Sequence, residues 1–150
     1  MIRDDIKAAL VEAMKAKDAP RVAALRLVQA ALKNRDIEAR SAGAPADDDA
    51  LVIEVLRKMA KQRRESMAMF EAGGRQELAV AEAGELAVIE SFLPARMEAA
   101  EAEAAIRAII AETGASSIKD MGRVMAEVKA RLAGRIDPAE ASALVRAALA

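Results

Sequence analysis

The chain of 150 residues has no cysteine, histidine, tryptophan or tyrosine, and only two phenylalanines. The first two absences exclude disulfide bonds, zinc sites of the usual Cys/His kinds, thiol nucleophiles and a histidine general base. No apolar run approaches the roughly 18 residues that a membrane-spanning helix needs. The opening residues, Met-Ile-Arg-Asp-Asp, put charges where a signal peptide needs an apolar core. We therefore expect a cytoplasmic setting with no membrane, no metal and no cofactor.

An excess of charge of one sign is also lacking. The 23 Lys and Arg residues and 24 Asp and Glu residues leave a formal net charge of −1, so nucleic-acid binding would need a local basic patch. Hydrophobic residues make up 54% of the chain, and many of them are alanine. Runs of β-branched and aromatic residues typical of strands are absent, while apolar residues recur at helical spacing. This pattern predicts an all-α protein.

Capping signals divide the chain into seven predicted helices. Asp18 with Pro20 and Asp137 with Pro138 are typical helix starts, and Ser117-x-x-Asp120 resembles a capping box. An Ala- and Glu-rich stretch follows Pro94 and predicts a domain boundary there. We expect an N-terminal four-helix bundle (1–94) and a C-terminal three-helix bundle (95–150). The first four helices are expected at 2–17, from 18 to about 40, about 48–72 and 75–92, and the last three carry Ile106, Val124 and Val145.

Three charged residues lie on apolar helix stripes in the predicted hairpin around Gly73-Gly74. Arg63 falls on the stripe of the first helix, and Glu82 and Glu85 fall on that of the second, with Leu78, Ala81 and Ile89. Antiparallel pairing about the turn sets Arg63 level with residue 84, between the two glutamates. We expect a partly buried ion pair that fixes the register of the hairpin. A carboxylate pair for acid–base chemistry and a polar seam for a partner are the alternatives.

The sixth predicted helix is the best candidate for a binding surface. From Lys119 to Arg135 there are five basic and two acidic residues. Basic residues separated by small ones form a low ridge that a phosphate backbone could approach. A solvated helix face and a protein-binding face are the alternatives, and a weaker basic face lies on the third helix at Arg57, Lys61 and Arg64. The far side of the sixth helix holds Lys119, Gly122, Arg123, Ala126, Lys129, Ala130 and Ala133.

Several motifs resemble the GatB/YqeY family in order and in combination. They are the KQRRES segment (61–66), the E-x-x-E-L segment (82–86) before Phe-Leu-Pro, and the DMGRVM segment (120–125). The resemblance implies four helices followed by three, and a relation to the C-terminal tail of the B subunit of the glutamine-dependent tRNA amidotransferase. That tail helps engage tRNA. Residues that match its pattern here are Gly122, Arg123, Met125, Lys129, Gly134 and Arg135.

An enzymatic function has weaker support in the sequence. Ser116-Ser117 near Lys119 suggests a Ser/Lys amidase, but capping of the sixth helix explains the serines better, and neither Gly-rich nucleotide-binding motif is present. We expect a non-catalytic module that binds tRNA or a tRNA-handling enzyme through its C-terminal domain. A helical adaptor without RNA contact, using the Ala-rich face of the fifth helix or the polar ridge of the second, is the alternative. A glutamine-dependent carbon–nitrogen ligase is the third.

Overall fold

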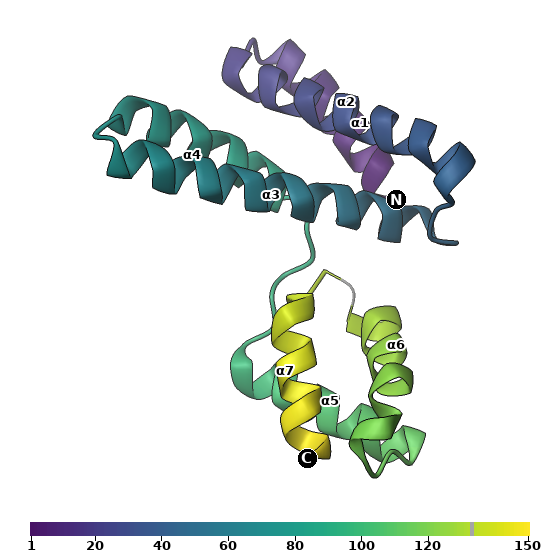
Figure 1. Cartoon of the computed structure of the whole chain (residues 1–150). Coiled ribbons are helices and arrows are strands. Elements are labelled where there is room, and N and C mark those ends of the chain that lie inside the picture. The colour runs from purple at the N-terminus through teal and green to yellow at the C-terminus, as the bar shows by residue number, and fades with distance from the viewer. Residues whose placement is uncertain (133) are drawn as a thin grey trace. The chain divides into compact units, whose positions relative to one another are not determined.

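The computed structural model describes residues 1–132 and 134–150, and these residues form helices and no strand, which confirms the all-α prediction. Figure 1 shows the elements in chain order. The chain divides into two compact units, Met1–Leu93 and Pro94–Ala150, and each is described here by itself. The elements are α1 (Ile2–Lys15), α2 (Ala19–Ala42), α3 (Asp48–Ala72), α4 (Gln76–Glu90), α5 (Ala99–Thr113), the 3₁₀ turn η1 (Ile118–Asp120), α6 (Met121–Leu132) and α7 (Pro138–Leu149).

Aspartate caps begin three of these helices. The side chains of Asp18, Asp47 and Asp137 each accept a hydrogen bond from a backbone N–H in the first turn of α2, α3 and α7. Such a cap satisfies one of the amide donors that have no partner inside the helix. The first helix ends at Lys15, two residues earlier than predicted, because Lys17 adopts a positive φ of 55°. That conformation leaves the right-handed helix and lets the chain reverse into α2.

The N-terminal unit is built around α2, which contacts α1, α3 and α4. The buried residues of its core are aliphatic side chains and Met59, and the partly buried ring of Phe92 packs against them. The buried part of α3 runs only from Leu51 to Ala60. The largest fully buried side chains of this unit are Ile6, Leu25, Val28, Val52, Leu56 and Ile89.

The α3–α4 hairpin extends beyond this core, as Figure 1 shows. No side chain of α3 after Ala60 is buried, and α4 buries only Ala79 and Ile89. The two helices turn at Gly74, whose φ of 72° suits glycine. The prediction that Ala81 faces the partner helix is wrong, since Ala81 is exposed and Ala79 is buried. The rest of the predicted stripe is kept, since Leu78, Glu82 and Glu85 are half-buried and Ile89 is buried.

The C-terminal unit packs α5, α6 and α7 against one another. Its core includes Ile106 from α5, Val124 from α6 and Val145 from α7. The chain leaves α5 at Gly114, which takes the left-handed conformation at φ 68°. The backbone N–H of Met97 donates to the carbonyl of Arg135 at 2.8 Å and ties the segment before α5 to the loop after α6.

Candidate functional site

The structure brings Arg63, Glu82 and Glu85 together across the α3–α4 hairpin. Nε of Arg63 lies 2.9 Å from Oε2 of Glu85 and 3.5 Å from Oε2 of Glu82. Arg63 comes from the part of α3 beyond the core, and both glutamates come from the facing side of α4. The spacing of the two helices about the Gly73-Gly74 turn thus sets the three charged groups level with one another.

The cluster is partly buried, with side-chain exposures of 21% for Arg63, 19% for Glu82 and 31% for Glu85. Nε of Arg63 and Oε2 of Glu82 are shielded from solvent without a well-formed hydrogen bond between them. A charged group at such a position costs free energy unless an opposite charge compensates it. Both carboxylates face the guanidinium of Arg63, so the geometry fits an ion pair better than acid–base chemistry.

The candidate surface on α6 keeps its small residues exposed. Gly122, Ala126, Lys129 and Ala130 are exposed, and Lys119 is exposed on η1 just before the helix. A Cβ atom added at Gly122 would meet no atom within 4 Å, so packing within the chain does not require this glycine. Ala133, which the sequence places on the same side, lies outside the described residues, and Gly134 after it has a φ of 78°.

Ion pairs reduce the positive charge that the sequence suggests for this surface. Arg123 donates to Asp120 at 3.1 Å, and Arg135 donates to Glu101 of α5 at 3.0 Å. Arg131 pairs with Glu112 and Glu127, and its pKa is raised above the ordinary value, chiefly by the hydrogen bond to Glu112. Two cations of the surface have no ion pair among the described residues, and they are Lys119 and Lys129.

The serines before α6 belong to a helix cap. Ser117 and Asp120 form a capping box, in which each side chain accepts from the backbone of the other residue. The backbone N–H of Ser116 also donates to Asp120 at 3.0 Å. These hydrogen bonds, that of Ser116 foremost, lower the pKa of Asp120 below its ordinary value. The capping box is confirmed, and it accounts for Ser117 without an amidase.

The second basic face, on α3, is joined to its surroundings by ion pairs. Arg64 donates to Glu90 of α4 at 2.6 Å, while Lys61 is exposed. Arg35 of α2 lies 3.7 Å from Glu54 of α3. These contacts are those of a solvated helix face with cross-helix charge pairs.

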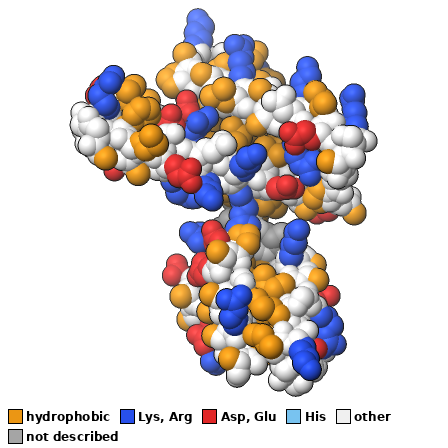
Figure 2. Space-filling view, viewed as in Figure 1, with side chains coloured by type: hydrophobic (Ala, Val, Ile, Leu, Met, Phe, Trp, Pro, Cys, Tyr) orange, Lys and Arg blue, Asp and Glu red, His pale blue; other side chains and the backbone are white. Residues whose placement is uncertain are grey.

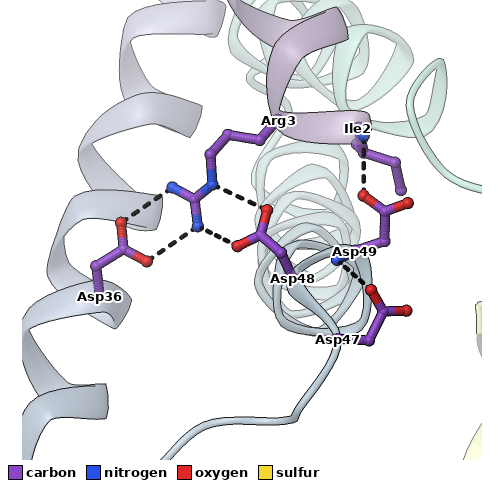
Figure 3. Close-up of polar contacts among 6 residues, drawn as sticks. All are labelled: Ile2, Arg3, Asp36, Asp47, Asp48 and Asp49. Carbon is purple, nitrogen blue, oxygen red and sulfur yellow. Dashed lines mark hydrogen bonds and ion pairs between the residues drawn. The ribbon is translucent and has the colours of Figure 1, made fainter.

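The most connected polar cluster escaped the sequence analysis. Figure 3 shows Arg3 of α1 between Asp36 of α2 and Asp48 of α3. Its guanidinium donates twice to each carboxylate, at 2.9 and 3.0 Å to Asp36 and at 3.1 and 3.0 Å to Asp48. The backbone N–H of Ile2 donates to Asp49 at 2.9 Å, and Asp47 caps α3. This Arg3 clamp ties three helices together at one end of the unit.

The clamp changes the acid–base properties of its members. The hydrogen bonds from Arg3 lower the pKa of Asp48, and the nearby Lys7 contributes to the same direction. The two carboxylates raise the pKa of Arg3 above its ordinary value, Asp48 most strongly. The acidic run of residues 47–49 was visible in the sequence as a helix start. Its pairing with Arg3 was not visible, because it depends on how three helices meet.

Comparisons with known proteins identify a family over nearly the whole chain and relatives over about two thirds of it. A family model described as "Yqey-like protein" matches residues 3–149. The chain is 35% identical over 103 residues to "Altered inheritance of mitochondria protein 41, mitochondrial" of Eremothecium gossypii. It is 30% identical over 104 residues to the protein of the same name of Kluyveromyces lactis. Each match covers 69% of this chain and 55% of the relative, so the chain spans about half the length of these curated relatives.

The names of these relatives bear on the expected compartment. Both are described as mitochondrial proteins, which contradicts the expectation of a cytoplasmic setting. The expectation relied on composition and on the charged opening residues, and neither reports the compartment of a helical protein that lacks cysteine. Among the described residues, no helix is long and apolar enough to cross a membrane.

Proposed function

Because this chain belongs to the YqeY-like protein family, we propose that it is a non-catalytic helical module that binds tRNA, or an enzyme that handles tRNA, through its C-terminal unit. We also propose that the two units are separate domains, a four-helix bundle and a three-helix bundle. The observation that carries the binding proposal is the exposed ridge of α6, where Lys119 and Lys129 stand beside Gly122 and Ala126.

This ridge suits a phosphate backbone for two physical reasons. Small side chains let the backbone of a nucleic acid approach the helix closely, and free lysines supply affinity through the release of counterions. Arg123 and Arg135 act differently from the lysines, since both already neutralise carboxylates of the same unit. The exposed ridge has no aromatic side chain for stacking bases, so recognition would rest on shape and phosphates.

A salt titration of binding to total tRNA tests the proposal. The variant Lys119→Ala/Lys129→Ala should weaken binding and lower the slope of log affinity against log salt by about one per lost phosphate contact. The matched control, Lys58→Ala/Lys61→Ala, removes the same charge from exposed positions of α3. Equal slopes for the two double variants, or no binding of the unaltered chain at low salt, would refute it.

Gly122→Ala separates a binding role from a structural one. The added methyl group meets no atom of the chain, so the fold should be kept or slightly stabilised. If the ridge holds RNA closely, the same substitution should weaken tRNA binding, because the methyl group lies between the helix and the phosphates. A variant that binds as tightly as the unaltered chain would show that close approach at Gly122 plays no part.

An adaptor without RNA contact is the second candidate. The observation that favours it is the polar ridge of α2, where Arg26, Lys33 and Arg40 are exposed and have no ion pair among the described residues. The glutamine-dependent ligase draws less support, because Ser117 is engaged in a helix cap and the glutamates of the hairpin face Arg63.

A further inference from the structure

The outward face of α2 carries a row of exposed neutral residues with the spacing of a helix-packing seam. Leu27 and Ile37 are 45% and 51% exposed and lie on the side of α2 opposite its buried residues Leu25, Val28 and Leu32. Successive members of the row are separated by four, three, four and three residues, so they form one stripe along the helix. We call this stripe the α2 seam, and its members are Ala23, Leu27, Ala30, Asn34 and Ile37.

A row of cations runs along one side of the α2 seam. Arg26, Lys33 and Arg40 are seven residues apart, so they align along the helix at steps of about 10.5 Å. All three are exposed. Figure 2 shows Lys and Arg side chains standing along the edge of the N-terminal unit formed by α1 and α2.

These three cations have no acidic partner among the described residues, a property that most lysines there share and most arginines do not. Ten other arginines form ion pairs, including Arg3 and Arg35 close by in the same unit. Two acidic residues lie between Lys33 and Arg40. Asp36 accepts both of its bonds from Arg3, and Glu38 lies on the other flank of the α2 seam. The chain thus supplies carboxylates to most of its arginines and leaves this row open.

We propose that the α2 seam docks an amphipathic α-helix of another protein that carries an Asp or Glu every seven residues beside its apolar stripe. The alanines of the seam allow the two helix axes to approach closely, and Leu27 and Ile37 fill the spaces between the partner's apolar side chains. Each cation of the row pairs with one carboxylate of the partner helix, so there is one such pair for every two helical turns. From Ala23 to Ile37 the seam is about 21 Å long, which corresponds to a partner helix of about four turns.

A second copy of this chain does not fit the seam. In antiparallel pairing the row of Arg26, Lys33 and Arg40 would face its own copy, and like charges repel. In parallel pairing it would face the opposite flank of α2, where Ala24 and Ala31 offer no charge and Glu38 offers one. RNA fits less well too, because phosphates would leave Leu27 and Ile37 against a polar surface. This seam lies in a different unit from the α6 ridge, so the two proposals fail separately.

The test uses the full chain and two synthetic helical peptides of about three heptads. Both peptides have Leu and Ala at the seam positions, and the flanking positions are Glu in one and Lys in the other. Backbone amide shifts in NMR spectra report the affinity and the place of binding. We expect the Glu peptide to shift the amides of Ala23 to Ile37 and to bind about tenfold or more tightly than the Lys peptide.

Charge reversal supplies the control that a structural role would not reproduce. The variant Arg26→Glu/Lys33→Glu/Arg40→Glu should reverse the preference and bind the Lys peptide better, while Lys58→Glu/Lys61→Glu/Arg146→Glu should keep the original preference. Leu27→Ser/Ile37→Ser should weaken both peptides.

Four results would overturn the proposal. The first is no binding of the Glu peptide, and the second is an unchanged preference after charge reversal. The third is self-association of the chain that is lost on Leu27→Ser/Ile37→Ser, which would make a second copy the occupant. The fourth is binding of total tRNA that is lost on reversal of the α2 cations, which would make the row an RNA contact.

Discussion

At the scale of single residues, Arg3 and Arg63 each neutralise two carboxylates where α3 packs against another helix. Each guanidinium lies between two carboxylates and joins α3 to another helix, Arg3 through Asp48 and Arg63 through Glu82 and Glu85. Arginine suits both positions because its planar fork offers several donors and stays charged at every ordinary pH. The two clusters differ in hydrogen bonding. Arg3 forms four well-formed hydrogen bonds to its carboxylates, whereas Nε of Arg63 and Oε2 of Glu82 form none.

Arg63→Met should destabilise the N-terminal unit, because it leaves the partly buried carboxylates of Glu82 and Glu85 without their cation. We expect a loss of about 2 kcal/mol in the free energy of unfolding, less than the 3–5 kcal/mol typical of fully buried pairs. Urea denaturation followed by circular dichroism measures it. Arg63→Met/Glu82→Leu/Glu85→Leu should recover much of the loss, and equal destabilisation of the single and triple variants would contradict the ion-pair interpretation.

Acid should weaken the Arg3 clamp. The pKa of Asp48 is lower in the folded chain than in the unfolded chain, so its contribution is present above the unfolded pKa of about 3.9 and is lost as the pH falls through the folded pKa. Urea denaturation at pH 6 and in steps below pH 4 measures this loss. Asp48→Asn should be less stable at pH 6 and should lose less on acidification. An identical pH dependence in the variant and the unaltered chain would contradict the clamp.

The pairing of Arg63 can be predicted from the sequence, and the pairing of Arg3 cannot. Arg63 can be recognised in the sequence because its charge interrupts an apolar stripe within one hairpin. The position of the turn alone then determines which residues of α4 lie opposite it. Arg3 gives no such signal, since its partners lie 33 and 45 residues away on two other helices. The pairing of Arg135 with Glu101 depends in the same way on how α5 meets the end of α6, so the charge of the α6 ridge is overestimated from sequence.

At the scale of elements, two glycines of the α3–α4 hairpin should respond oppositely to alanine. Gly84 lies within α4, and a Cβ there meets no atom within 4 Å, so Gly84→Ala should stabilise by about 0.5–1 kcal/mol. Gly74 has a φ of 72°, so Gly74→Ala should destabilise by about 1–2 kcal/mol. Thermal and urea unfolding measure both, and effects of the same sign would contradict this account of the hairpin.

Helix starts are the elements that the sequence predicts best here, because a cap is local chemistry. Asp18 and Asp137 accept backbone hydrogen bonds where their sequence context predicts it. Helix ends and faces are less predictable. The φ of Lys17 ends α1 early. On α4, Ala79 is buried where Ala81 was predicted, because packing against α3 decides which of the many alanines is buried. In an Ala-rich helix, burial of a methyl group gives too weak a periodic signal.

At the scale of the whole molecule, the two units have separate aliphatic cores. Leu56 is fully buried in the first, and Leu56→Ala should cost that unit about 2–5 kcal/mol. Hydrogen exchange of the full chain measures the effect in each unit. Amides of α1 to α3 should lose protection, while those of α5 to α7 should keep theirs if the units unfold independently. A parallel loss of protection in both units would show one cooperative domain.

The hairpin formed by α3 and α4 extends past the hydrophobic core of the N-terminal unit, so its tip is packed less tightly than its base. Beyond Ala60 no side chain of α3 is fully buried. The two helices meet there through the ion pair of Arg63 with Glu82 and Glu85, the buried Ala79, and half-buried Met67, Phe70 and Leu78. Segments with few buried apolar contacts open at lower free energy than the core. We therefore expect the tip of the hairpin to exchange its amide hydrogens faster than the base near Val52 and Leu56, and the loss of Arg63 to speed exchange at the tip more than at the base.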